Sequence, residues 1–294
     1  MLGNNPASPV QISRRNKNLQ NRFGCLQTEG NMKRRKFNHE SNTTHESHNH
    51  HRADRPDTPN RRFPQEEYYE PGDNTGNIEV VGLNGFTHVR CHRASQRACQ
   101  CGRYACHINS MIIAVDGACP GNGSDKAVMS ACGVYFGPLE DFDTDQQNWS
   151  WRVRNKPGYA HTSQRAELHA ALGALYAAKQ YATEGGQWPC EPPECLSPCR
   201  INHIVIKSDS AYLVNAMTSS IKKWQLNGWQ TAKNTPVKNR DLWEEMIQRV
   251  QELADLDTTV DFWLVPREMN KEADKLANVG LGSDFGSVGD DCSS

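Results

Sequence analysis

The order of apolar segments between residues 110 and 280 is the feature that most constrains the fold of this chain. Short apolar or alternating runs predict strands, whereas apolar residues that repeat at three- and four-residue spacing predict helices. Three predicted strands are followed by a helix, a strand, two helices, a strand and a last helix, over residues 111–117, 127–136, 149–154, 163–182, 201–207, 211–218, 242–256, 258–266 and 271–281. This order predicts an α/β fold with a mixed sheet and helices on its faces.

The first 75 residues are much more polar than this patterned region. They carry 12 basic and 9 acidic side chains and few apolar ones. Such a segment buries too little apolar surface to offset its conformational entropy, so we predict a disordered tail over residues 1–75. Within it, the basic run 33–36 is open to two interpretations, a solvated charge cluster or a nuclear or nucleic-acid-binding signal. The His-rich tract 45–51 is predicted to be low-complexity chain, with metal binding as the alternative.

The other boundaries follow from composition. We predict a Cys-rich lead-in over residues 76–109, a folded domain over 110–280 with a Cys- and Pro-rich insertion at 184–200, and a flexible tail over 281–294. No stretch approaches the roughly 18 apolar residues that a membrane span needs. An apolar signal-peptide core is also missing, so we expect a nuclear or cytoplasmic protein, while the acid-free first 28 residues leave mitochondrial import open.

Four carboxylates lie at positions where α/β folds place ligand sites. Asp116 ends the first predicted strand and Asp209 follows the fourth, and each comes after an apolar run. Glu167 lies on the first predicted helix, and Asp274 opens the last one. Alone, each has an ordinary explanation as a turn former, a helix-surface charge or a partner of the helix dipole. Together they predict a cluster at the carboxyl ends of the strands, which a pair of Mg²⁺ ions would neutralise.

A basic segment over residues 222–240 lies between the two middle helices and contains no acidic residue. Its cations and tryptophans are Lys222, Lys223, Lys233, Lys238, Arg240, Trp224 and Trp229. Cations suit a phosphate backbone and aromatic faces suit sugar or base stacking, so the segment predicts a nucleic-acid contact. The alternative is that the tryptophans pack the base of the segment, which we favour for Trp229 and leave open for Trp224.

The chain contains 11 cysteines, most of which lie in two groups outside the predicted strands and helices. The first group precedes the first strand and the second lies in the insertion; their members are Cys91, Cys99, Cys101, Cys106, Cys190, Cys195 and Cys199. Neither group has the paired C-x₂-C spacing of common zinc modules, and the missing signal peptide disfavours disulfides. Free thiols and a Zn²⁺ site that joins the two groups both remain open.

Five segments resemble the signature motifs of type 1 ribonuclease H and follow one another in that family's order. They are VDGA at 115–118, QRAEL at 164–168, KSDSAY at 207–212, a segment from Asn227 to Trp243 similar to the family's substrate-binding handle and the helix after it, and NKEADKLA at 270–277. The resemblance implies an RNase H-like five-stranded mixed sheet of order 3-2-1-4-5 flanked by helices. It also implies endonucleolytic cleavage of the RNA strand of RNA–DNA hybrids, with 5′-phosphate and 3′-hydroxyl ends, by a monomer.

The resemblance assigns roles to individual residues. Asp116 would bridge two Mg²⁺ ions, or Mn²⁺ in their place, with Glu167 and Asp209 holding one ion and Asp274 the other. The residues it places against the hybrid are Gly117 and Asn122 near the RNA 2′-hydroxyl, Ser163 and Gln164 in the minor groove, and Tyr212, Lys222, Lys223, Trp224, Lys238, Asn239 and Arg240 at the handle. Contact with the 2′-hydroxyl is how a protein tells RNA from DNA.

Three features depart from the family pattern. Segment 265–270 has no histidine, which the best-known members carry in a longer loop before the last carboxylate, so we expect slower turnover with an intact metal site. Glu268 could replace that histidine as an acid or base or attract a metal ion, or it could form a surface ion pair. Ser220 stands where many relatives place a tryptophan on the DNA strand, and residues 1–75 lack the pattern of the hybrid-binding domain. A catalytically weak nucleic-acid-binding protein of the same fold is therefore the alternative function.

Overall fold

The computed structural model describes residues 61–65, 78–82, 85–90, 109–138, 148–183 and 201–282. All of them lie in the unit His48–Ser294, and residues 1–60 fall outside the described ranges. No helix within these ranges is long and apolar enough to cross a membrane.

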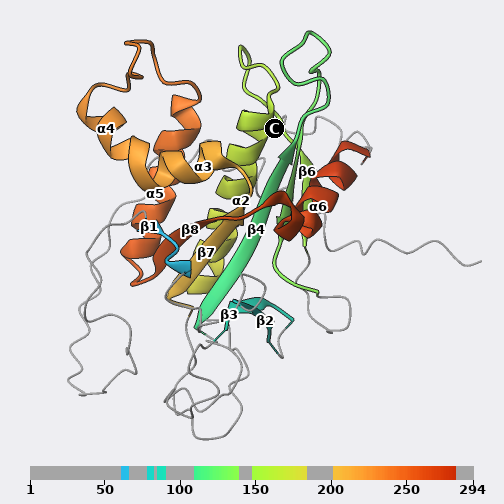
Figure 1. Ribbon diagram of the computed structural model, residues 1–294, viewed down its shortest axis with the longest axis vertical. Helices are drawn as coiled ribbons and strands as arrows, with labels where there is room; N and C mark the ends of the chain where they lie inside the picture. The colour runs from blue at the N-terminus through green and yellow to red at the C-terminus, as the bar shows by residue number, and fades with distance from the viewer. Residues whose placement is uncertain are drawn as a thin grey trace, which may run out of the picture. The chain divides into compact units, whose positions relative to one another are not determined.

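A six-stranded mixed sheet forms the centre of the described unit, with the strand order β1-β8-β7-β4-β5-β6 (Figure 1). The strands are β1 (Arg61–Arg62), β4 (Ser110–Ala118), β5 (Ala131–Tyr135), β6 (Trp149–Arg152), β7 (His203–Ser208) and β8 (Thr259–Leu264). The pairs β1–β8, β8–β7 and β7–β4 are parallel, whereas β4–β5 and β5–β6 are antiparallel. The five predicted strands and their order 3-2-1-4-5 are confirmed, and β1 is a sixth strand that was not predicted.

Helices cover both faces of the sheet (Figure 1). They are α2 (Ser163–Thr183), α3 (Ala211–Asn215), α4 (Ile221–Leu226), α5 (Arg240–Ala254) and α6 (Lys271–Gly282), with a π-helical turn at Ala216–Ser220 and a 3₁₀ turn at Arg267–Met269. α2 packs on β4 and on α5, and α6 packs over β4 and β5 on the opposite face. The buried side of α2 consists largely of alanine and leucine, which form the main core with Ile113 and Val115 of β4.

Gly133 in β5 decides how closely α6 approaches the sheet. A Cβ atom at this position would collide with the backbone of Ala273 and Ala277. Because the helix lies directly on the strand, its first turn reaches the carboxyl end of β4 and brings Asp274 to the cleft beside Asp116.

The prediction of a disordered amino-terminal tail is wrong at residues 61–65. β1 pairs with β8, and Phe63 directly after it is buried against Trp263, with ring centroids 5.2 Å apart. Arg61 donates two hydrogen bonds to the carboxylate of Asp261, which is fully buried. The low average hydrophobicity of residues 1–75 gives no sign that Arg61 and Phe63 are anchored, because their partners lie 200 residues further along the chain.

A hairpin from the predicted Cys-rich lead-in packs on the face of the sheet that Phe63 also covers. It consists of β2 (Glu79–Val81) and β3 (Thr87–Val89), which pair antiparallel. Val89 packs with Ile112 of β4 and Val205 of β7 in a small second core. The sheet face that carries Ile112 and Val205 is called the second face below.

Replacing Arg61 with alanine should destabilise the chain by about 2–3 kcal/mol, because the buried Asp261 carboxylate loses a bidentate partner. Arg62→Ala is the matched control, since Arg62 makes an exposed hydrogen bond to Asn215. For that control we expect less than about 0.5 kcal/mol. Urea unfolding of both variants measures the difference, and equal effects would show that β1 does not stabilise the fold through Asp261.

Candidate metal centre

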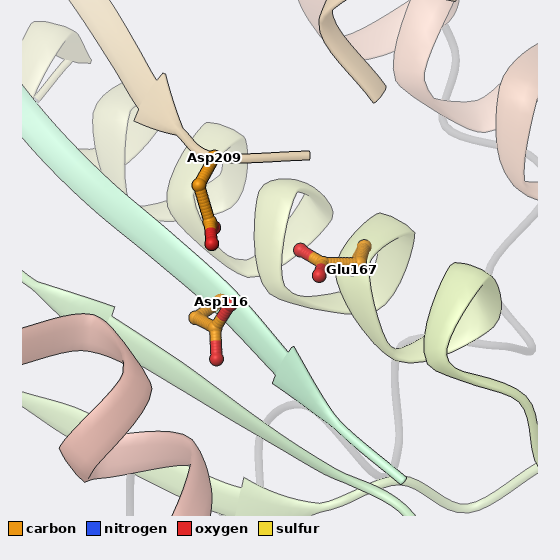
Figure 2. Close-up of side chains that lie close together, drawn as sticks. All are labelled: Asp116, Glu167 and Asp209. Carbon is orange, nitrogen blue, oxygen red and sulfur yellow. The ribbon is translucent and has the colours of Figure 1, made fainter. Parts of the chain in front are cut away.

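Three carboxylates from separate parts of the chain converge near the carboxyl ends of β4 and β7 (Figure 2). Asp116 comes from β4, Glu167 from α2, and Asp209 directly follows β7. One oxygen of each carboxylate lies within 4.8 Å of the others. Hard divalent cations bind clusters of oxygen ligands of this kind. The structure therefore brings together three of the four predicted carboxylates at metal-binding distance.

Gly117 allows this convergence. A Cβ atom on Gly117 would collide with the backbone of Ala166 and Glu167. Without one, α2 lies directly against β4 and presents Glu167 to Asp116 (Figure 2). The prediction that Asp116 ends its strand is wrong by two residues, because Gly117 and Ala118 still pair with β5.

Asp274, the fourth predicted carboxylate, lies in the first turn of α6 and lines the same cleft as the other three, which has a volume of about 350 Å³. Its Oδ1 accepts a hydrogen bond from the guanidinium of Arg267 at 2.6 Å, and its Oδ2 accepts one from Asn278 at 3.3 Å. Arg267 belongs to the segment that lacks the family histidine, and its side chain is exposed. A positive charge thus contacts the cluster from its solvent side.

Asn270 is a residue of this site that the sequence analysis did not single out. Its side chain is 1% exposed, and Nδ2 donates hydrogen bonds to the backbone oxygen of Val115 and to Oδ1 of Asp209, both at 3.0 Å. The amide thereby ties the end of β4 to the carboxylate that follows β7. Its sequence signal was its place at the start of the motif that carries Asp274, but the role depends on contacts across the sheet.

Burial and mutual repulsion alter the proton affinity of the cluster. Burial first, and then the carboxylates of Asp209 and Asp274, together raise the pKa of Asp116 to about 7, while Arg267 opposes the shift. Burial also raises the pKa of Glu167 well above its ordinary value, with Asp116 and Asp209 adding to the effect. Without a counter-ion, the cluster therefore holds protons close to neutral pH.

The donor set fits a divalent cation. Oε2 of Glu167 is buried and has no hydrogen-bond partner among the described residues. Leaving a carboxylate oxygen in that state is costly, so the site is shaped for a ligand from outside the chain. Ligands that are all carboxylate oxygens suit Mg²⁺ or Mn²⁺.

The predicted contacts to the RNA strand lie around the start of α2. Asn122 is exposed in the loop after β4, and its Oδ1 accepts a hydrogen bond from the backbone N–H of Ser163 at 3.0 Å. Gly117 and Ser163 line the metal cleft, and Gln164 beside them is exposed. The structure thus groups these four residues at one edge of the carboxylate cluster.

The handle, residues 222–240, comprises most of α4, the loop after it and Arg240. Its exposed cations are Lys222, Lys223, Lys233, Lys238 and Arg240. Trp229 is 8% exposed and packs against Trp224, with ring centroids 6.3 Å apart, which confirms the packing interpretation for Trp229. Trp224 is half-buried and also contacts Trp243, with centroids 5.9 Å apart. The tryptophans therefore form the base that carries the cations.

A hydrogen-bond network connects the handle to α2. Asn239 donates to the hydroxyl of Tyr212 at 3.3 Å and accepts a hydrogen bond from Arg165. Arg165 is buried and also donates two hydrogen bonds to Asp241. This network holds the start of α5 against the start of α2, so the handle keeps a defined position relative to Glu167.

Two departures from the family pattern are placed by the structure. Ser220 is half-buried at the end of the π-helical turn. Glu268 is exposed and lines a cavity other than the carboxylate cleft. The seven cysteines of the zinc hypothesis all lie outside the described residues.

The sequence model of the RNase H family matches residues 108–281, which include all four carboxylates. The chain belongs to the RNase H family. The family and the RNase H-like fold predicted from the sequence motifs are confirmed by this match and by the sheet order.

The sequences of individual relatives match this chain over part of its length. Ribonuclease H of Chlorobaculum parvum is 34% identical over 142 residues, which cover 47% of this chain and 73% of that protein. Ribonuclease H1 of Mus musculus is 29% identical over 175 residues, which cover 58% of this chain and 50% of the mouse protein. Among solved structures, RNase H1 from Halobacterium salinarum NRC-1 is 21% identical, with a TM-score of 0.34, over 59% of this chain and 98% of that one.

The raised pKa of Asp116 predicts how the stability of the metal-free protein depends on pH. Between about pH 4 and pH 7 the folded carboxyl holds a proton that the unfolded one has lost, so stability falls as pH rises through this window. Asp116→Asn removes that loss and should stabilise the chain at pH 8 by about 4 kcal/mol, with little effect below pH 4. Urea unfolding in a chelator at several pH values measures this, and an unchanged pH slope in the variant would contradict it.

Proposed function

We propose that this protein is an endoribonuclease that hydrolyses the RNA strand of RNA–DNA hybrids and leaves 5′-phosphate and 3′-hydroxyl ends. The observation that carries the proposal is the convergence of Asp116, Glu167 and Asp209, with Asp274 in the same cleft. Membership of the RNase H family and the names of its relatives support hybrid ribonuclease activity.

The cations expected at this site are two Mg²⁺ ions, with Mn²⁺ as a substitute. Asp116 would contact both, Glu167 and Asp209 one of them, and Asp274 the other. Such a pair activates a water nucleophile and stabilises the leaving oxygen of a phosphodiester. The chain supplies the carboxylates in a fixed arrangement, and the hydrogen bond from Asn270 orients one oxygen of Asp209 before any cation arrives.

The hybrid would lie across the carboxylates, between the start of α2 and the handle. On the RNA side, Asn122, Ser163 and Gln164 offer polar groups for the 2′-hydroxyl and the minor groove. On the other side, the exposed cations of the handle would neutralise phosphates. Because Arg165 links the two surfaces through Asn239, both strands would be held in one orientation relative to the carboxylates.

Cleavage of a labelled RNA–DNA hybrid tests the proposed activity. The unsubstituted chain should cleave the RNA strand with Mg²⁺ or Mn²⁺, and Asp116→Asn and Asp209→Asn should each reduce the rate at least about a hundredfold, because the cations lose a ligand. Asp255→Asn is the matched control, since Asp255 is an exposed carboxylate after α5, and it should leave the rate unchanged. Mass spectrometry of the products identifies the ends.

A chain that cleaves no faster than its Asp116→Asn variant, while it binds the hybrid equally well with and without Mg²⁺, would be a nucleic-acid-binding protein of this fold. Circular dichroism of each variant separates loss of catalysis from loss of folding.

The handle predicts a salt dependence of hybrid binding. Replacing Lys222 and Lys238 with alanine should weaken binding, because two phosphate contacts are lost and binding then releases fewer counterions. The slope of the logarithm of the binding constant against the logarithm of the salt concentration should fall in magnitude by about 1.5. Lys179→Ala is the control, since Lys179 lies near the far end of α2 and pairs with Glu252. Fluorescence anisotropy in an Asp116→Asn background keeps the hybrid intact, and an unchanged slope would exclude these lysines from the interface.

A further inference from the structure

Lys207 is a buried cation two residues before Asp209. Its side chain is 9% exposed and lies on the second face of the sheet, where Nζ forms an ion pair with the carboxylate of Glu79. The ammonium also lies 5.8 Å from the centroid of the Trp263 ring. A buried ammonium group is costly unless it is paired, so Glu79 is the charge that makes Lys207 tolerable at this position.

The register of the sheet places Lys207 beside the metal centre. Lys207 is directly opposite Ala114 on β4, and Asp116 is two residues further along the same face of β4. Strand spacing and rise then put the Cα atoms of Lys207 and Asp116 about 8 Å apart. A positive charge without a partner at this place would attract the neighbouring carboxylates and repel the cations that they bind.

Asn270 borders both groups. It lines a cavity of about 330 Å³ together with Glu79 and Lys207, and it donates a hydrogen bond to Asp209 of the metal centre. The ion pair and the carboxylate cluster thus both border Asn270. Any net positive charge left on Lys207 would therefore weaken the binding of cations at the cluster.

The hairpin that carries Glu79 is anchored to the sheet. The backbone N–H of Val89 donates to Oγ of Ser110 at 2.9 Å, and the N–H of Thr87 donates to the backbone oxygen of Phe136 at 2.7 Å. Glu79 pairs with Val89 across the hairpin, so its position is determined by these contacts. The hairpin precedes residues 108–281, so the partner of Lys207 comes from outside the region that matches the RNase H family.

We propose that Glu79 is a positioning residue for the metal centre, which neutralises Lys207 and holds its ammonium group on the second face of the sheet. No net positive charge then remains beside the four carboxylates to oppose the binding of divalent cations. The proposal rests on the proposed function in taking the carboxylate cluster as a cation site. It predicts that an element upstream of the family domain sets the metal affinity.

The test compares metal binding by full-length variants. Glu79→Gln preserves shape and removes the charge, so it should raise the dissociation constant for Mn²⁺, measured by calorimetry without substrate, by about fivefold. The Mg²⁺ concentration for half-maximal hybrid cleavage should rise by a similar factor, while kcat at saturating Mg²⁺ stays within about twofold of the unsubstituted rate. Lys207→Met alone should not weaken Mn²⁺ binding, and the double variant Glu79→Gln/Lys207→Met should restore it.

Glu272→Gln is the matched control, because Glu272 lines the same cavity but is exposed, and it should leave Mn²⁺ affinity nearly unchanged. The proposal is overturned if Glu79→Gln leaves the affinity unchanged, if Glu272→Gln weakens it equally, or if the double variant does not restore it. Failure of restoration would assign Glu79 a purely structural role, and thermal unfolding without metal would show the accompanying loss of stability. Because Mn²⁺ binding is measured without hybrid, a chain that follows this pattern yet cleaves nothing would contradict the proposed function and uphold the role of Glu79.

Discussion

Mutual repulsion among Asp116, Glu167 and Asp209 is the interaction that the rest of the structure has to oppose. Three carboxylates with oxygens within 4.8 Å of one another do not stay together unless the backbone holds them there. Each comes from a different element, and the main core of alanine, valine and isoleucine between α2 and the sheet fixes those elements in place. Burial and the neighbouring carboxylates raise the pKa of Asp116, so the site without a cation favours the protonated acid.

Contacts from different parts of the fold hold the three carboxylates in place. The missing side chain of Gly117 lets α2 reach β4, and the buried amide of Asn270 links β4 to Asp209. Arg165, two residues before Glu167, ties α2 to the start of α5 through Asp241. The same helix therefore carries a cation ligand and determines where the handle sits.

The second face of the sheet extends this principle beyond the region that matches the RNase H family. Asp261 and Lys207 are buried on that face, and each pairs with a residue from upstream of the match: Asp261 with Arg61, and Lys207 with Glu79. Burying a charge requires a partner of opposite sign. The folded unit of this chain consequently includes β1 and the β2–β3 hairpin as well as the family domain.

Local pattern and motif determined much of this protein from the sequence alone: five strands in their order, the main helices, and the four acidic positions. They did so because apolar periodicity and residues that follow apolar strands are local signals. Tertiary structure alone decided that Arg61 joins the sheet and that Phe63 is buried beside it. It also decided that Trp229 packs against Trp224, that Asn270 contacts Asp209, and that Glu79 pairs with Lys207. The physical reason is that burial of a charge or an amide depends on a partner that can lie 200 residues away, and no local pattern records that distance.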